Sequence, residues 1–176
     1  MRAAIRQEIE SINPLDDLER AHQSEALAWV DSGASLFRIA RPDVPPKHLV
    51  SYFVLVDGEH ILLVDHLRAQ LWLPTGGHVE PDEHPRAAVL RELREELEIV
   101  PESDIAHPKF ITCTTTVGLT AGHTDVSLWY VIAYPRHKSL KHDTTEFADL
   151  RWFHFSEVPA SRVDPHLGRF MLKLST

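Results

Sequence analysis

Three carboxylates within one turn of a predicted helix constrain this chain more than any other feature. The run Arg91-Glu92-Leu93-Arg94-Glu95-Glu96 spaces its three glutamates three, one and four residues apart. On an α-helix this spacing puts all three on one side. Like charges at that spacing repel each other by about 0.2–0.5 kcal/mol per pair. A hard divalent cation, which prefers carboxylate oxygens, is the most economical explanation for such a cluster.

The same stretch carries further residues at fixed intervals. Gly77 is followed after five residues by Glu83 and after seven more by Arg91-Glu92. This pattern resembles the Nudix box. That box is a signature of glycine, glutamate and arginine residues at fixed spacings, and it ends in an apolar residue. The matched positions are Gly77, Glu83, Arg91, Glu92, Leu93, Glu95, Glu96 and Ile99. The approach to the box, from Leu71 to Glu80, also resembles the family.

One position departs from the box, because Glu98 stands where the family usually has glycine. Glycine after a helix usually relieves a left-handed backbone position. Pro101 disfavours a helical Val100 and offers another way to end the helix. We therefore expect a different helix exit and an unchanged carboxylate cluster.

The resemblance implies an α/β/α sandwich that hydrolyses a diphosphate bond with Mg²⁺ or Mn²⁺. It also implies a small nucleotide substrate, in which a diphosphate links a nucleoside to another group. Such cations neutralise phosphate charge and activate water. A negative site that binds a negative substrate is consistent with this chemistry only if metal ions lie between them.

Candidate site residues follow from the box. We assign Glu92, Glu95 and Glu96 to metal coordination, with the carbonyl of Gly76 as a further ligand. The resemblance implies that Glu92 or a distant acid deprotonates the water, and Glu146 is the candidate for that acid. Glu146 lies six residues before Trp152, like the late acid that precedes the family's last strand.

Neighbouring residues have supporting interpretations. Arg91 is read as an ion-pair brace for the carboxylates, with a phosphate contact as the alternative. Glu83 either caps the helix or pairs with Arg91, and Gly77 supports the site. Asp143 and Asp149 are fallbacks for Glu146, and Glu80 is either an outer ligand or a surface acid.

The twelve histidines do not form a zinc-binding motif in the sequence. They are scattered, and no HExxH or paired Cys/His set occurs among them. His123 and Asp125 are two residues apart on a predicted strand, so a substrate role for His123 is one hypothesis. Trp72, Trp129 and Tyr130 are large aromatics that either stack on a base or fill the core.

Composition excludes some classes of function. The net charge of −8 argues against general nucleic-acid binding, which depends on basic patches. Cys113 is the only cysteine, so no internal disulfide is possible, which fits the cytoplasm. The N-terminus has no apolar signal core, and the longest apolar runs are too short to span a bilayer.

The 176 residues are expected to form one hydrolase domain, 48–176, with an N-terminal helical extension, 1–47. Asn13-Pro14 predicts the start of a helix that Gly33 stops, and Pro42, Pro45 and Pro46 form a stiff connector. Two interpretations of the extension stay open. It is either a cap on the catalytic core, or an element of a homodimer or substrate lid.

The remaining chain predicts an α/β (α+β) fold with a mixed β-sheet between helices. Asp57-Gly58 is a hairpin signal, and the run before it is apolar on both faces, as in a strand covered on both sides. A box helix is predicted at Pro85–Leu97 after a Gly76-Gly77 loop, and a last helix from Asp164-Pro165 to Leu174. Strands are predicted at Leu49–Val56, Ile61–Leu67, Leu71–Leu73, Lys109–Val117, Asp125–Tyr134 and Leu150–Phe155, with a turn at Gly118–Gly122.

Two other functions compete with the metal-dependent diphosphohydrolase. One is a catalytically inactive module that binds a nucleotide in the same fold. The other is a prenyl-diphosphate isomerase, for which Cys113 is a weak candidate acid–base residue. Selectivity is expected to lie in the loops Gly118–Thr124 and His137–Thr145 and in the N-terminal segment.

Overall fold

The computed structural model describes residues 1–41, 43–101, 104–116 and 122–176. Its helices are α1 (Arg2–Glu10), α2 (Asp17–Asp31), α3 (Pro85–Leu97) and α4 (Leu167–Leu174), with the short 3₁₀ helix η2 (Phe155–Glu157). Its strands are β1 (Lys47–Asp57), β2 (His60–His66), β3 (Leu71–Leu73), β4 (Thr75–His78), β5 (Phe110–Thr115), β6 (Thr124–Ala133) and β7 (Phe147–His154). Within the described ranges, none of the helices is long and apolar enough to cross a membrane.

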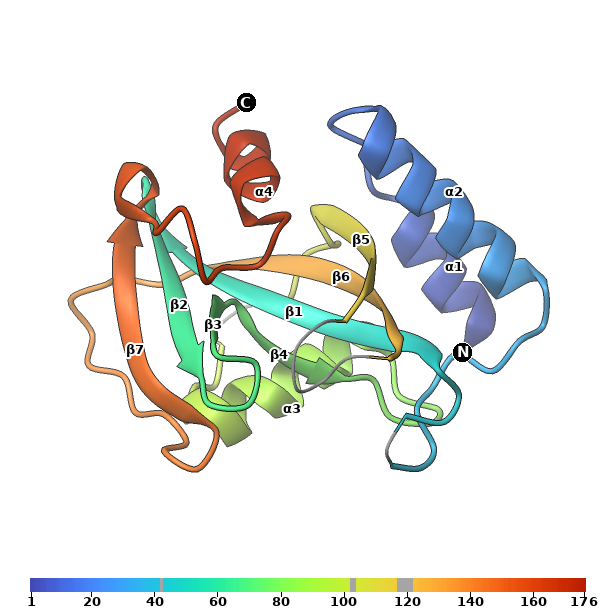
Figure 1. Ribbon diagram of the computed structural model, residues 1–176, viewed down its shortest axis with the longest axis horizontal. Coiled ribbons are helices and arrows are strands. Elements are labelled where there is room, and N and C mark those ends of the chain that lie inside the picture. The colour runs from blue at the N-terminus through green and yellow to red at the C-terminus, as the bar shows by residue number, and fades with distance from the viewer. Residues whose placement is uncertain (42, 102–103, 117–121) are drawn as a thin grey trace.

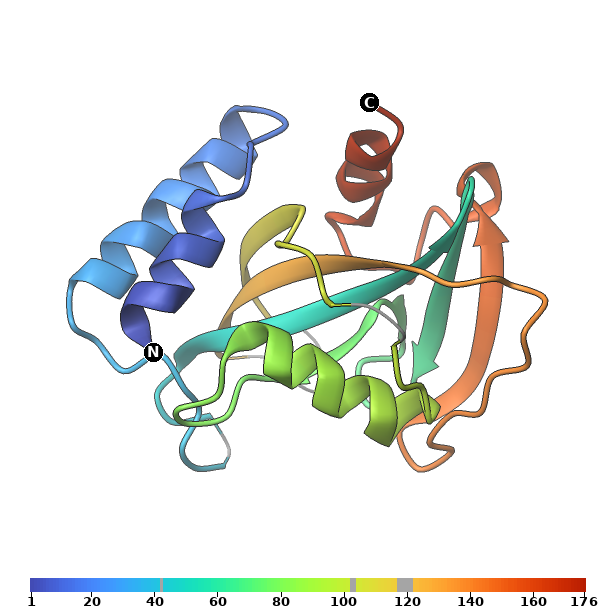
Figure 2. The same cartoon turned by 180° about the vertical axis from the view of Figure 1, so that it is seen from behind.

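A mixed seven-stranded sheet lies between helices α3 and α4 (Figure 1). Its main path runs β3-β2-β1-β6-β5, with β4 paired to β1 and β7 paired to β2. Strands β1 and β6 are parallel, whereas the other pairs are antiparallel. Figure 2 shows α3 covering one face of the sheet from behind. The predicted mixed sheet between helices is therefore confirmed.

Strand β1 is apolar on both faces because each face contributes to a different core. Phe53 and Leu55 join the cluster that contains Leu93 of α3. Val54 joins the second cluster, which contains Phe170 of α4. The predicted hairpin is also present, since Asp57 pairs with His60 around the turn.

Strand β4 was not predicted, because two glycines in a row are typical of a loop. Gly77 instead pairs with Ser51 and Gly76 with Tyr52, antiparallel to β1. The prediction of a loop here was wrong: tertiary pairing outweighs the weak strand propensity of glycine. The pairing fixes the backbone that faces α3.

Helix α3 has the predicted bounds, but its exit differs from the expectation. Glu98 itself takes the left-handed conformation, at φ 54° and ψ 30°. The amide of Ile99 then donates to the carbonyl of Leu93 at 2.9 Å, which closes the helix end. The chain keeps the turn that glycine would make, and Glu98 carries its steric cost.

The N-terminal segment forms two helices, and the first was not predicted. Helix α2 begins at Asp17, and not at Asn13-Pro14, because Asp16 is the residue that caps it by accepting from the amide of Glu19. Gly33, at φ 80°, follows the helix end as expected. Arg169 of α4 also binds Asp16, so the cap is held by the other end of the chain.

Both N-terminal helices pack on the core of the sheet. Ile5, Ile9 and Val30 are fully buried in the cluster that includes α3. The buried carboxylate of Glu8 accepts from Arg86 of α3 at 2.6 Å. This packing favours the interpretation of residues 1–47 as a cap, and the domain boundary at 47 stays a prediction.

The remaining predicted elements are present with shifted ends. Strand β7 starts at Phe147, earlier than the predicted Leu150, because Phe147 is buried and pairs with His66. Helix α4 begins at Leu167, after Asp164 accepts from the amide of His166. The strands predicted around Cys113 and Trp129 are β5 and β6, and the predicted turn between them lies largely outside the described residues.

Candidate functional site

The two glycines of β4 make room for the carboxylates of α3. A Cβ atom on Gly77 would lie 2.0 Å from Oε1 of Glu92. The amide of Gly76 donates to Oε2 of Glu96 at 3.2 Å. Gly76 has φ +143°, and a Cβ atom there would lie 2.3 Å from the carbonyl oxygen of Ser51. The strand therefore brings bare backbone against the predicted metal ligands.

Arg91 lies at the centre of an ion-pair network. Its Nε and Nη2 atoms donate to the two oxygens of Glu83, each at 3.0 Å, and Nη1 donates to Glu92 at 2.6 Å. Nη2 also donates to the carbonyl of His78 at 3.0 Å. Burial opposes ionisation of Glu83, but the hydrogen bonds from Arg91 outweigh it and lower the pKa of that carboxyl. The bidentate pair fixes Arg91, which in turn orients Glu92.

The cap of α3 comes from a different residue. Nδ1 of His84 accepts from the amide of Arg86, so His84 caps the helix and Glu83 is left to hold Arg91. Of the two alternatives for Glu83, the structure places it in the pair with Arg91.

Glu96 is a buried carboxylate and Glu92 a partly buried one, and their charges repel each other. Glu96 is 4% exposed, and burial followed by the charges of Glu92 and Glu146 raises its pKa well above the usual value. Burial also raises the pKa of Glu92, despite the hydrogen bond from Arg91. Arg91 therefore compensates this negative charge only in part, and a bound cation would supply the remainder.

Glu95 lies differently from its two neighbours. Its side chain is 61% exposed and approaches Arg91 at 3.5 Å. In the described part of the chain, the oxygens of Glu92, Glu95 and Glu96 are not among the ligand atoms that gather within 4.8 Å of one another. Coordination by all three requires Glu95 to rotate inward. The donor set, carboxylate oxygens beside exposed backbone, nevertheless suits a hard divalent cation.

Glu146 is close enough for its charge to raise the pKa of both Glu92 and Glu96. It directly precedes β7, its carbonyl accepts from Leu67 at 3.0 Å, and its carboxylate lies 3.7 Å from Nε2 of His66. Its backbone is thus anchored while its side chain stays half exposed.

The fallback acids have partners elsewhere. Asp143 accepts from the amide and hydroxyl of Thr145, and Asp149 pairs with Arg151 at 3.1 Å. The amide of Asp143 also donates to the carbonyl of Glu96 at 3.0 Å, which ties this loop to the end of α3.

Several other candidates lie in the core. Trp129 and Tyr130 are fully buried, and Trp72 is 8% exposed. Cys113 donates weakly to the carbonyl of His22 in α2, and burial raises the pKa of its thiol to about 12. Such a thiol stays protonated at neutral pH, which argues against an acid–base role.

Glu80 is exposed, and its amide donates to Glu83.

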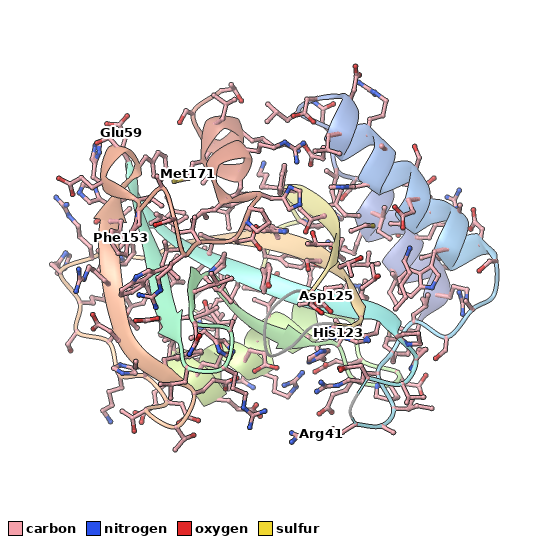
Figure 3. All side chains as sticks on the ribbon, in the orientation of Figure 1. Arg41, Glu59, His123, Asp125, Phe153 and Met171 are labelled. Atoms are coloured by element: carbon pink, nitrogen blue, oxygen red, sulfur yellow. The ribbon has the colours of Figure 1, made fainter. Side chains whose placement is uncertain are left out.

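The sequence interpretation missed one group of side chains. Asp43, His48, His78 and His123 each offer a ligand atom, and these atoms lie within 4.8 Å of one another. Figure 3 shows His123 beside Asp125 near the start of β1. Because the group joins four segments far apart in the sequence, no local spacing reveals it. The parallel pairing of His48 with Asp125 is the register that assembles it.

Comparisons with known proteins agree with the observed fold. The family model for the NUDIX domain matches residues 46–174. No curated protein matches the sequence at a significant level.

Three solved structures illustrate the similarity of the fold. The MutT NUDIX hydrolase from Burkholderia pseudomallei is 23% identical, with 74% of this chain and 98% of that chain covered at a TM-score of 0.56. The E. coli dihydroneopterin triphosphate pyrophosphohydrolase is 14% identical, covering 80% and 97% at a TM-score of 0.57. A C. elegans Ap4A hydrolase in a binary complex is 19% identical, covering 72% and 95% at a TM-score of 0.54.

The family match spans well over half of the chain and includes the glycines of β4, the arginine network and the glutamates of α3. The chain therefore belongs to the Nudix family, whose enzymes hydrolyse pyrophosphate bonds with the help of a divalent metal.

Proposed function

We propose that this protein hydrolyses the pyrophosphate bond of a nucleoside diphosphate linked to another moiety, with Mg²⁺ or Mn²⁺ as cofactor. The observation that carries the proposal is the pair of carboxylates, partly buried Glu92 and buried Glu96, against the glycine backbone of β4. Glu92, Glu95, Glu96 and the carbonyl of Gly76 would hold the cation. The names of the similar structures, a dihydroneopterin triphosphate pyrophosphohydrolase and an Ap4A hydrolase, support a nucleotide-like substrate class.

A bound divalent cation would neutralise phosphate charge and lower the pKa of a water molecule. The chain's own residues would do the rest. Arg91 holds Glu92 in one orientation, so that part of the geometry is set before substrate binds. Glu146, half exposed beside the pair, would accept the proton of the attacking water.

The experiment is a screen of hydrolysis over nucleoside triphosphates, ADP-ribose, dinucleoside polyphosphates and nucleotide sugars, each with Mg²⁺, Mn²⁺ or a chelator. Glu96→Gln replaces a proposed carboxylate ligand of the cation with a neutral amide and is expected to lower kcat by about 10³-fold. Glu157→Gln, which changes an exposed glutamate of η2, is the matched control and should keep full activity. Activity that survives both Glu96→Gln and the chelator would refute the proposal.

The roles of ligand and base can be separated. Glu146→Gln should lower kcat while the metal concentration for half activity changes little, because its role is proton transfer. Glu92→Gln should raise that metal concentration as well. Equal effects of both variants on metal dependence would assign Glu146 to the ligands instead, and effects in one site need not add.

The two alternatives make different predictions. An inactive binding module would bind a nucleotide without releasing product in any metal. An isomerase would need an acid–base residue beside the cation, and the protonated thiol of Cys113 lies against α2 instead.

A further inference from the structure

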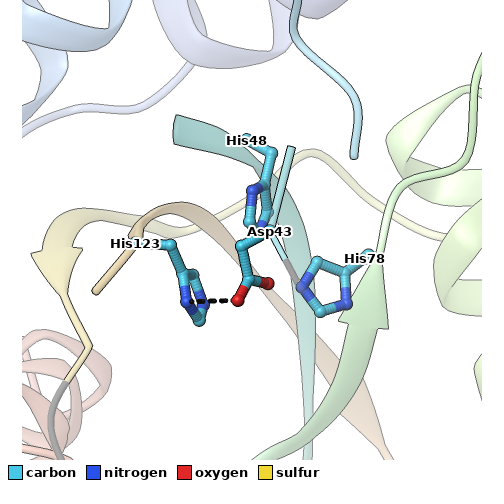
Figure 4. Close-up of side chains that lie close together, drawn as sticks. All are labelled: Asp43, His48, His78 and His123. Carbon is cyan, nitrogen blue, oxygen red and sulfur yellow. Dashed lines mark ion pairs between the residues drawn. The ribbon is translucent and has the colours of Figure 1, made fainter. Parts of the chain in front are cut away.

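Three histidines and one aspartate converge at one edge of the sheet (Figure 4). His48 lies near the start of β1, His78 ends β4 and His123 directly precedes β6. Asp43 comes from the segment before β1. The ring centroid of His48 lies 4.7 Å from that of His78 and 5.0 Å from that of His123.

The hydrogen bonding of His48 decides which ring nitrogen carries the hydrogen when the ring is neutral. Nδ1 lies 3.0 Å from the carbonyl oxygen of Pro45, which can only accept, so Nδ1 carries the hydrogen. In the neutral ring, Nε2 then presents a lone pair into the cluster. Metal-binding histidines commonly donate their other N–H to a backbone carbonyl in this way.

Nε2 of His48 faces a second acceptor. It lies 3.2 Å from Oδ1 of Asp125, at ion-pair distance, although neither atom makes a well-aligned hydrogen bond among the residues that the structure describes. His48 is fully buried, so bulk water does not compensate. Nε2 of His78 is likewise buried without a partner in the described chain. Buried acceptors that face each other cost free energy unless a proton or a metal ion lies between them.

The charges around the group favour a cation. Asp43 lies 3.3 Å from Nδ1 of His123, and Asp125 lies 3.3 Å from Nε2 of the same ring. Arg38 approaches Asp43 at 3.6 Å and is the opposing positive charge. Among the ion pairs of the described residues, two carboxylates thus outnumber one guanidinium around the three imidazoles.

We propose that Asp43, His48, His78 and His123 form a second metal site that binds Zn²⁺. Three imidazoles and one carboxylate are a four-ligand set that suits tetrahedral zinc, whereas Mg²⁺ prefers oxygen ligands only. The ion would join the segment before β1 to the edge formed by β1, β4 and β6. His78 follows Gly76 and Gly77 in β4, so the zinc would hold the far end of the strand that faces the carboxylates.

Zinc titration of the full chain, freed of any affinity tag and stripped with a chelator, tests the proposal. Millimolar Mg²⁺ in the buffer would occupy the glutamates of α3, if these bind the cation as proposed above, and would leave the histidines for zinc. One zinc ion per chain is expected, with a rise in Tm of about 5–10 °C at roughly 100 times the Kd. Co²⁺ in place of zinc should give the visible absorption of a tetrahedral complex.

Variants locate the site. His48→Asn and His123→Asn should each weaken zinc binding by about 100-fold or more. Glu96→Gln should leave zinc binding unchanged, because it acts at the other site. The matched control is His154→Asn: His154 and His60 form a pair at 5.1 Å that lacks a third histidine among the described residues.

Two results would overturn the proposal: a parent chain that retains no zinc after gel filtration, or a His48→Asn variant that binds it as tightly as the parent. If His48→Asn fails to fold, as judged by circular dichroism, His78→Asn provides the same comparison. Loss of zinc together with normal circular dichroism in either variant would support the site.

Discussion

The carboxylate group of α3 and the histidine group at the sheet edge differ in how the chain assembles them. The glutamates follow one another on a single helix, so the spacing in the sequence already predicts their proximity. The histidines come from β1, β4 and the residue before β6, so only the sheet register brings them together. Hard oxygen ligands characterise the first group and borderline imidazoles the second. Local geometry can be read from sequence, whereas long-range geometry cannot.

Strand β4 connects the two groups, since Gly76 and Gly77 face the glutamates and His78 belongs to the histidines. Substitutions in this strand therefore test whether the two groups are independent.

Gly76→Ala should have the largest effect and should affect both groups. Its Cβ atom would collide with the backbone of Ser51, which cannot move without disrupting the pairing of β4 with β1. We expect a loss of about 3 kcal/mol or more in the free energy of unfolding, measured by urea denaturation. Gly122→Ala is the control, because Gly122 also has a positive φ, 115°, but no described heavy atom lies within 4 Å of its Cβ position. A loss no larger than that of the control would contradict the steric argument.

Gly77→Ala should affect one group only. Its Cβ atom would displace the carboxylate of Glu92, the far end of a flexible side chain, so the fold survives while the ligand moves. Hydrolysis should fall by about 10²-fold, or roughly 2.7 kcal/mol, with little change in zinc binding. Gly168→Ala in α4, where no described atom opposes the new Cβ atom, should be neutral. Equal losses of activity in both variants would show that Glu92 is not held where we describe it.

The pH dependence of stability should reveal the buried charge of Glu96. Burial raises its pKa above 4.5, the ordinary value. Between that pH and the folded pKa, the folded chain therefore holds a proton that the unfolded chain has lost. The stability from this group is present below about pH 4.5 and is lost as the pH rises through the folded pKa. With a chelator present, the Tm of Glu96→Gln relative to that of the parent should rise by about 3 °C or more as the pH is raised from 5 to 8. A difference that does not change with pH would mean that Glu96 is not desolvated.

Added Mg²⁺ should reverse this order at pH 8, because the cation stabilises the parent, whereas the neutral amide of the Glu96→Gln variant offers it no charge to neutralise. Zn²⁺ at the histidines should stabilise both chains alike. An equal response of both chains to Mg²⁺ would place that cation elsewhere.

Glu98→Gly should have the smallest effect. Glycine relieves the left-handed strain at the helix exit, worth about 1 kcal/mol, but it also adds entropy to the unfolded chain. The ion pair of Glu98 with Lys141 at 2.7 Å is exposed and contributes little. We expect a net gain of up to about 1 kcal/mol in thermal denaturation, with activity unchanged. A loss of stability would mean that the ion pair matters more than the backbone strain.

Periodicity and turn chemistry predicted most of the elements. Helix α3 was predicted with its observed bounds because Pro85 starts it and its apolar residues recur at helical spacing. Helix α1 was missed because its apolar residues, Ile5 and Ile9, are few, and burial against the sheet stabilises it. Strand β4 was missed because its stability also comes from a tertiary contact, the pairing with β1, and not from its own residues.

The candidate site could be predicted in part. The spacing of the box indicated which glutamates lie on one face of α3, and the structure adds that Glu95 turns outward. The role of Arg91 as a brace depends on its contact with Glu83, which the spacing also suggested. The histidine group depends on strand register, which no local pattern in the sequence specifies.

The ion pair between buried Glu8 and partly buried Arg86 has a practical consequence. The family match begins at residue 46, but a chain trimmed there would leave Arg86 without Glu8 and would open the surface that Ile5 and Ile9 cover. Newly exposed apolar patches promote self-association. The first two helices thus shield an apolar surface that would otherwise drive aggregation, and anyone producing the enzyme in quantity should retain them.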